Sequence, residues 1–242
     1  MMDKMRKLYH SKKVLLLCIH HHSLVKNIAK YTFVVPNISG MPIFRFGLTF
    51  LSKANSIRLN SIDWANTPKL FAQRGTLLKS IWDTTPYWLQ SWVGSAKHFA
   101  ADFNHTYCIS HFEDNGLMSI GSQDWSDYSV QSNLIFSLHE SAGIVVYAKG
   151  LLNYIAVVFK DGNTVQVIEN KMGQIKVLQS FDFSYMEDVM YDVSVFVKKG
   201  HLTFKINDQQ FGETLVNREC GAAGFVVSKG TIVARDFVVK RL

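Results

Sequence analysis

Two carboxylates and two aromatic residues gather in one short stretch of the chain, at Asp124, Trp125, Asp127 and Tyr128. Side chains of these types could contact a sugar, which offers an apolar face and many hydroxyl groups. The same aspartates are also typical of a turn in which carboxylates accept backbone N–H groups. We rank such capping first, contact with a ligand or with calcium second, and a catalytic carboxylate pair third.

A second group of candidate residues surrounds Gly150, which separates two apolar runs. Lys149 and Tyr154 flank this turn, and Tyr147 precedes it. A cation and aromatic side chains at the rim of a sheet could line a polar cleft. In the structural alternative, which we rank first, Lys149 lays its apolar stem on its neighbours and Tyr154 is half buried. All three residues remain candidates for ligand binding.

Motifs of the common catalytic and cofactor sites are absent from the sequence. The chain has no GxSxG, no HExxH, no glycine-rich phosphate loop and no EF-hand loop. Its cysteines, Cys18, Cys108 and Cys220, form no CxxC pair. We therefore expect no catalytic residue and no cofactor, with calcium at the aspartates as the alternative.

The charge distribution bears on the partners of the protein. The chain has 242 residues and a formal net charge of +7, and much of that excess lies in the first thirty residues, which indicates a basic end and no nucleic-acid surface. The apolar run 14–19 is too short for a signal peptide, and no segment approaches the roughly 20 apolar residues of a spanning helix. We expect a cytoplasmic rather than a secreted protein, with no nucleic-acid partner and no membrane span.

Composition and patterning divide the chain into four segments. Residues 1–30 are a basic segment that we expect to be disordered or irregular. Residues 31–68 hold the alternating runs PIFRFGLTF and SIRLNSIDW, which predict a strand pair left from a preceding β-sandwich. Residues 69–104 form a connector rich in Trp, and residues 105–242 form the main sandwich.

The connector offers a further aromatic cluster. Trp88 and Trp92 are four residues apart, so a short helix would place them on one face. A platform for sugar rings is one interpretation, but aromatic clusters of this kind more often fill cores, and we rank the core first.

Strand signals become dense after residue 105. SVQSNLIFSL and YDVSVFV alternate as half-buried strands do. GIVVYAK and YIAVVFK are continuous apolar runs, typical of central strands covered on both faces, and DGN at 161–163 predicts a tight hairpin turn. Short strands with turns between them and almost no helical pattern predict an all-β, antiparallel β-sandwich.

The order of several segments resembles a known architecture. DWSDYSVQSNLIF, AGIVVYAKGLLNYIAVVF, YDVSVFVKKGHLTFKINDQQF and CGAAGFVVSKGTIVARDFVV resemble the concanavalin A-like, or laminin G-like, sandwich, a jelly roll. A similar order occurs in the 3-keto-disaccharide hydrolase family. With the preceding VPNISGMPIFRFGLTF, IRLNSIDWANTP and IWDTTPYWLQSW, residues 33–242 resemble the C-terminal, non-catalytic region of bacterial ADP-ribosylglycohydrolase family proteins.

This resemblance implies a function and a partner. The catalytic core of that family is a helical domain with two magnesium ions, and nothing in this chain resembles it. The resemblance therefore implies an accessory module, a carbohydrate or ADP-ribose-like ligand, and a helical catalytic domain as partner. Relatives often carry Arg where Lys149 stands, and Lys does not reproduce the bidentate contacts of Arg.

Three functions from different classes remain. A non-catalytic binding or accessory module ranks first, and a structural remnant without independent activity ranks second. A glycoside hydrolase-type enzyme ranks third. Such an enzyme needs carboxylates with raised pKa values on the concave face of the sheet, and Glu140, Glu169 and Glu187 are available but follow no paired pattern.

Overall fold

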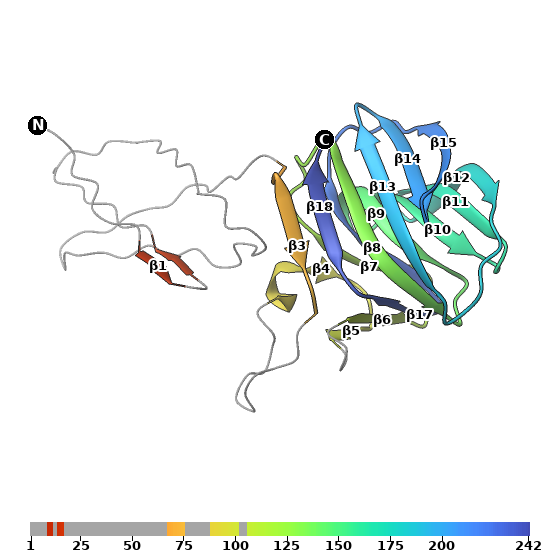
Figure 1. Cartoon of the computed structure of the whole chain (residues 1–242), viewed down its shortest axis with the longest axis horizontal. Coiled ribbons are helices and arrows are strands. Elements are labelled where there is room, and N and C mark those ends of the chain that lie inside the picture. Colours follow the sequence, from red (N-terminus) through yellow and green to blue (C-terminus); the bar gives the residue numbers. More distant parts are fainter. Residues whose placement is uncertain (1–8, 12–13, 17–66, 76–87, 102–105) are drawn as a thin grey trace, which may run out of the picture.

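The computed structural model describes residues 9–11, 14–16, 67–75, 88–101 and 106–242. The predicted strand pair within residues 31–66 lies outside these ranges. From residue 67 onward, the described strands form two antiparallel sheets that face each other, which confirms the predicted all-β sandwich (Figure 1). Thirteen of these sixteen strands, β6 to β18, belong to the region that the sequence assigns to the main sandwich.

Seven strands form one sheet, in the spatial order β12 (Gln174–Asp182), β11 (Thr164–Lys171), β10 (Asn153–Lys160), β9 (Ser141–Gly150), β16 (Ala222–Ser228), β7 (Gly116–Ile120) and β4 (Val93–Gly94). The other sheet has nine strands. Its main order is β15 (Gln209–Leu215), β14 (His201–Ile206), β13 (Met190–Lys198), β8 (Tyr128–Ser137), β17 (Gly230–Ala234), β6 (Tyr107–His111) and β5 (His98–Ala101), and β18 (Phe237–Arg241) pairs with both β8 and β3 (Leu70–Gln73).

Hairpins join several pairs of sequential strands, among them β10 and β11. The three-residue turn between β10 and β11, residues 161–163, places Asp161 and Gly162 at φ values of 55° and 74°, in the left-handed region that tight hairpin turns use. The pairing then runs from Lys160 with Thr164 to Asn153 with Lys171. The DGN turn predicted from the sequence is confirmed.

The main core lies between the two sheets. Inward residues of the nine-stranded sheet, such as Phe136 on β8 and Val195 on β13, are fully buried. Phe136 meets Phe159 of β10 with 4.3 Å between ring centroids, a contact that joins the sheets directly. Alternation along β13 leaves Phe196 on the opposite, outer face.

A second apolar cluster lies on the outer face of the seven-stranded sheet. In β10, Ile155 and Val157 belong to the main core, whereas Tyr154, Ala156 and Val158 belong to this second cluster. All of them are buried. The continuous apolar runs of β9 and β10 thus arise because these strands are buried on both faces, as the sequence predicts.

The Trp-rich segment contributes directly to the sandwich, because β3, β4 and β5 all lie within residues 69–104 and pair with sheet strands. A 3₁₀ helix, Leu89–Ser91, separates Trp88 from Trp92 where the spacing predicted a short helix. Both indoles are 7% exposed and pack edge-on against Phe99 and Tyr107. The interpretation of these two residues as a sugar platform is therefore wrong, since a buried ring cannot stack on a sugar.

Within the basic N-terminal segment, β1 (Tyr9–Ser11) and β2 (Val14–Leu16) pair antiparallel. This short hairpin stands where we expected irregular chain. Among the described residues, no helix is long and apolar enough to cross a membrane.

Candidate functional site

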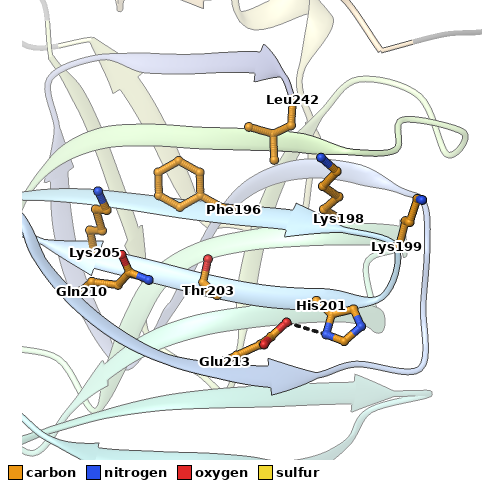
Figure 2. A pocket seen from close by; sticks show the side chains of 9 residues that line it. All are labelled: Phe196, Lys198, Lys199, His201, Thr203, Lys205, Gln210, Glu213 and Leu242. Atoms are coloured by element: carbon orange, nitrogen blue, oxygen red, sulfur yellow. Dashed lines mark ion pairs between the residues drawn. The ribbon is translucent and has the colours of Figure 1, made fainter.

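A hollow lies on the outer face of the nine-stranded sheet, over β13, β14 and β15 (Figure 2). Its volume of about 540 Å³ falls within the range of pockets that hold small ligands. We call it the outer hollow, and it is lined by Phe196, Lys198, Lys199, His201, Thr203, Lys205, Gln210, Glu213 and Leu242.

Strand register places these side chains in rows across the sheet. Phe196 of β13 pairs with Thr203 of β14, and Lys205 of β14 pairs with Gln210 of β15. In β13 and β14, the neighbours of Phe196, Thr203 and Lys205 along each strand point inward and are buried, so alternation sends these three side chains outward. An aromatic ring thus lies beside a hydroxyl, an ammonium and an amide on one surface.

A β-bulge positions the acidic residue of the outer hollow. The pairing of β14 with β15 shifts between Leu202 and Phe204, which inserts an extra residue of β15 opposite Thr203. Glu213 lies in this irregular stretch, and its Oε1 is 2.5 Å from Nδ1 of His201. Its carboxylate is therefore engaged by a neighbour at one side of the hollow, as Figure 2 shows.

Phe196 lies between two lysines in the close view of Figure 2, with Lys198 on one side and Lys205 on the other. The Lys205 ammonium is 5.9 Å from the centroid of the Phe196 ring, within reach of a cation–π interaction. The ring is half-buried. It offers an apolar surface with polar groups around it, the combination that sugar recognition uses.

Asp127 is the sequence-predicted residue that lies at this site. One of its carboxylate oxygens accepts the backbone N–H of Lys199 at 3.0 Å, and its carbonyl accepts the N–H of Leu242 at 2.8 Å. Both partners line the outer hollow. Asp127 therefore caps a turn, as we ranked first, and this capping fixes two residues at the rim of the hollow.

Asp127→Ala is expected to lower the free energy of unfolding by about 1–2 kcal/mol, because it removes the carboxylate acceptor and puts a less tolerant residue at φ = 48°. Asp127→Asn is the matched control, since Asn keeps an acceptor oxygen and tolerates this backbone region. Urea unfolding of both variants measures the difference. Equal stability of the Ala variant and the wild type would mean that the cap contributes nothing.

Tyr128 and Trp125 belong to the interior. Tyr128 is fully buried, donates its hydroxyl proton to the carbonyl of Gly221 at 3.0 Å, and accepts the N–H of Tyr147 at 2.8 Å. Burial raises the pKa of the Tyr128 phenol. Trp125 is also buried and packs against Tyr128. These aromatic residues of the predicted cluster join the two sheets and do not face a ligand.

Tyr147, Lys149 and Tyr154 do not form a common rim. Tyr147 is buried in the main core, and Tyr154 is buried in the second cluster on the outer face of the seven-stranded sheet. Burial raises the pKa of Tyr147 to about 12. The Lys149 ammonium donates to the carbonyl of Gln123 at 2.8 Å and contacts Sγ of Cys220 at 3.0 Å. Lys149 thus ties two loops together, and Tyr154 is fully rather than half buried.

The predicted calcium alternative finds few ligands. Asp124 is exposed and accepts a hydrogen bond from Ser122, while Asp127 is engaged by a backbone N–H. In the part of the chain that the structure describes, no group of three His, Cys, Asp or Glu residues could hold a metal ion. Calcium takes about six to eight oxygen ligands, and these two carboxylates do not supply such a set.

The sequence analysis did not identify the residues of the outer hollow, although the sequence holds one signal of an exposed apolar surface there. In YDVSVFV, the inward set runs through Tyr191, Val193, Val195 and Val197, so Phe196 falls on the polar face. An aromatic residue out of phase with the core marks an exposed apolar surface. The bulge that brings Glu213 to His201 has no comparable sequence signal.

No family model matches this chain, and no curated protein matches it. Solved structures do resemble it. The carbohydrate-binding module CBM66 from Bacillus subtilis has a TM-score of 0.56 at 13% identity, over 62% of this chain and 95% of that one. A galectin-like protein of unknown function from Bacillus subtilis has a TM-score of 0.50 at 14% identity, over 63% and 90%. A native glycosidic hydrolase has a TM-score of 0.51 at 8% identity, over 73% and 97%.

Identities this low establish the fold alone. The three structures include a binding module and a hydrolase, so the fold serves more than one activity. None of the structures named here is an ADP-ribosylglycohydrolase, and that part of the resemblance stays a prediction. From residue 67 onward, the chain has the galectin-like, concanavalin A-like β-sandwich fold that carbohydrate-binding modules and glycoside hydrolase-type proteins share.

Proposed function

We propose that this chain is a non-catalytic carbohydrate-binding module whose ligand lies in the outer hollow. The observation that carries the proposal is the half-buried Phe196 on the outer face of the sheet, with Thr203, Lys205 and Gln210 around it. An aromatic face can pack on the apolar side of a sugar ring while the hydroxyl, ammonium and amide groups bind its hydroxyls.

The surroundings of the candidate carboxylates support a non-catalytic role. A general acid in a glycosidase needs a raised pKa, whereas the Lys229 ammonium, 2.8 Å from Glu140, lowers the pKa of that carboxyl. Glu169 is 3.3 Å from the Arg218 guanidinium. Neither residue lines the outer hollow.

The role within a larger system is also a proposal. As an accessory module, the chain would keep a catalytic partner close to its saccharide. The helical partner domain and an ADP-ribose-like ligand come from the family resemblance. The cytoplasmic location stays a prediction.

The experiment is a binding screen of the full chain by thermal unfolding and affinity electrophoresis. The panel contains oligosaccharides from xylan, mannan, galactan, fructan and polygalacturonate, together with ADP-ribose. We expect at least one saccharide to raise the unfolding midpoint, because a ligand that binds only the folded state stabilises it. Cooperative unfolding with no shift across the panel would contradict the proposal and favour a structural remnant. Release of reducing sugar would favour the hydrolase alternative.

A further inference from the structure

The outer hollow carries a pronounced positive charge. Lys198, Lys199 and Lys205 all line it, and no ion pair involves any of the three among the described residues. Lys198 and Lys199 are exposed, and Lys205 is intermediate. Unpaired ammonium groups around one concave surface attract anions and raise their local concentration.

The negative groups near these lysines have other partners. Glu213 is bound to His201, and the Asp127 carboxylate accepts the Lys199 backbone N–H. Among the residues that line the hollow, Glu213 is the one with an acidic side chain. Three lysines line the same surface, so positive charge is in excess where a ligand would lie.

The positions of these charges fit a substituted sugar. We infer that the outer hollow binds a saccharide that carries an anionic substituent, namely a carboxylate, sulfate or phosphate. The sugar ring packs on Phe196, and Lys198 and Lys205, on either side of that ring in Figure 2, bind the anionic groups. Ammonium groups act as compact point charges without a preferred planar geometry, so the site accepts any of these anions. This inference rests on the proposed carbohydrate-binding function and deepens it.

The test compares matched ligands that differ in charge. The full chain is titrated with polygalacturonate and with its fully methyl-esterified form, with dextran sulfate and dextran, and with ADP-ribose and adenosine. We expect the charged member of at least one pair to bind about tenfold or more tightly, since a hydrogen bond to a charged group is worth roughly 1.5–3 kcal/mol. The arms separate acidic polysaccharides from phosphorylated sugars. The preference is expected to decline as salt is raised from low to physiological concentration.

A double variant and a matched control locate the effect. Lys198→Gln/Lys205→Gln removes two charges from the hollow and is expected to abolish the preference for the charged ligand. Lys171→Gln/Lys176→Gln removes two charges from exposed residues of β11 and β12 in the other sheet and is expected to leave it intact. Circular dichroism of each variant confirms that it is folded.

Four results would overturn the inference or its basis. Equal binding of neutral and charged saccharides would contradict the inferred preference for an anionic ligand and would leave the proposed carbohydrate-binding function intact. An unchanged preference in Lys198→Gln/Lys205→Gln would place the anion site elsewhere. Equally tight binding of a DNA oligonucleotide would indicate a general polyanion surface. Binding of no saccharide and no ADP-ribose would remove the proposed function itself.

Discussion

Trp92→Ala is expected to lower the free energy of unfolding by about 3–5 kcal/mol, the range for large aromatic residues deleted from a core. The indole lies between the two sheets, stacked on Phe225 at 5.7 Å and edge-on to Phe237 at 5.0 Å between ring centroids. Its N–H donates to the amide oxygen of the buried Gln73. The substitution therefore leaves a cavity and removes a buried hydrogen bond, which urea denaturation measures.

Phe112→Ala is the matched control, because Phe112 is 74% exposed and its deletion creates no cavity. We expect this variant to unfold within about 0.5 kcal/mol of the wild type. Saccharide binding by folded Trp92→Ala at low temperature is expected to match the wild type. If Trp92→Ala keeps its stability but loses saccharide binding, this result would support the interpretation of the Trp residues as a sugar platform.

Phe196→Ala is expected to weaken saccharide binding by about tenfold to a hundredfold. The ring contributes apolar area under the sugar, and covering a side chain of this size is worth roughly 1.5–3 kcal/mol. Stability is expected to change little, because the ring is on the outer face and outside both buried clusters. Isothermal titration with the saccharide that binds in the screen measures the affinity.

Phe196→Tyr is the conservative variant and is expected to retain binding, since its ring keeps the same apolar face. Phe112→Ala again serves as the negative control, because it removes an exposed aromatic residue away from the outer hollow. Wild-type affinity in Phe196→Ala would show that the ligand does not lie on this ring.

The sandwich was predictable because strand patterning is a local signal. Neighbouring residues alone determine the alternation of inward and outward side chains along residues 191–197. They also determine the backbone conformation of the turn at residues 161 and 162. The contribution of the Trp-rich segment was not predictable in this way. Strand β3 pairs with β18, far along the chain, and Gln73 of β3 meets Trp92 and Tyr107 only through tertiary packing.

The candidate site was predicted only in part, for a related reason. The sequence analysis placed Asp127 and Tyr128 in one cluster. In the structure Asp127 precedes β8 and lies at the rim of the outer hollow, whereas Tyr128 begins β8 and lies in the core. Sequence spacing cannot predict which of the two side chains is buried, because inward and outward side chains alternate only within the strand and the start of the strand is not known from the sequence. The lysines at 198 and 205 approach one surface through the pairing of two strands, and this proximity depends on register.

An NMR titration of the ¹⁵N-labelled full chain with the oligosaccharide panel tests most directly whether a saccharide binds in the outer hollow. We expect a binding saccharide to shift the backbone amides of Phe196, Thr203, Lys205 and Gln210, which lie together on the outer face. Shifts confined to residues 122–126 and to Lys149, or no shifts with any member of the panel, would contradict the placement of a carbohydrate site in the outer hollow.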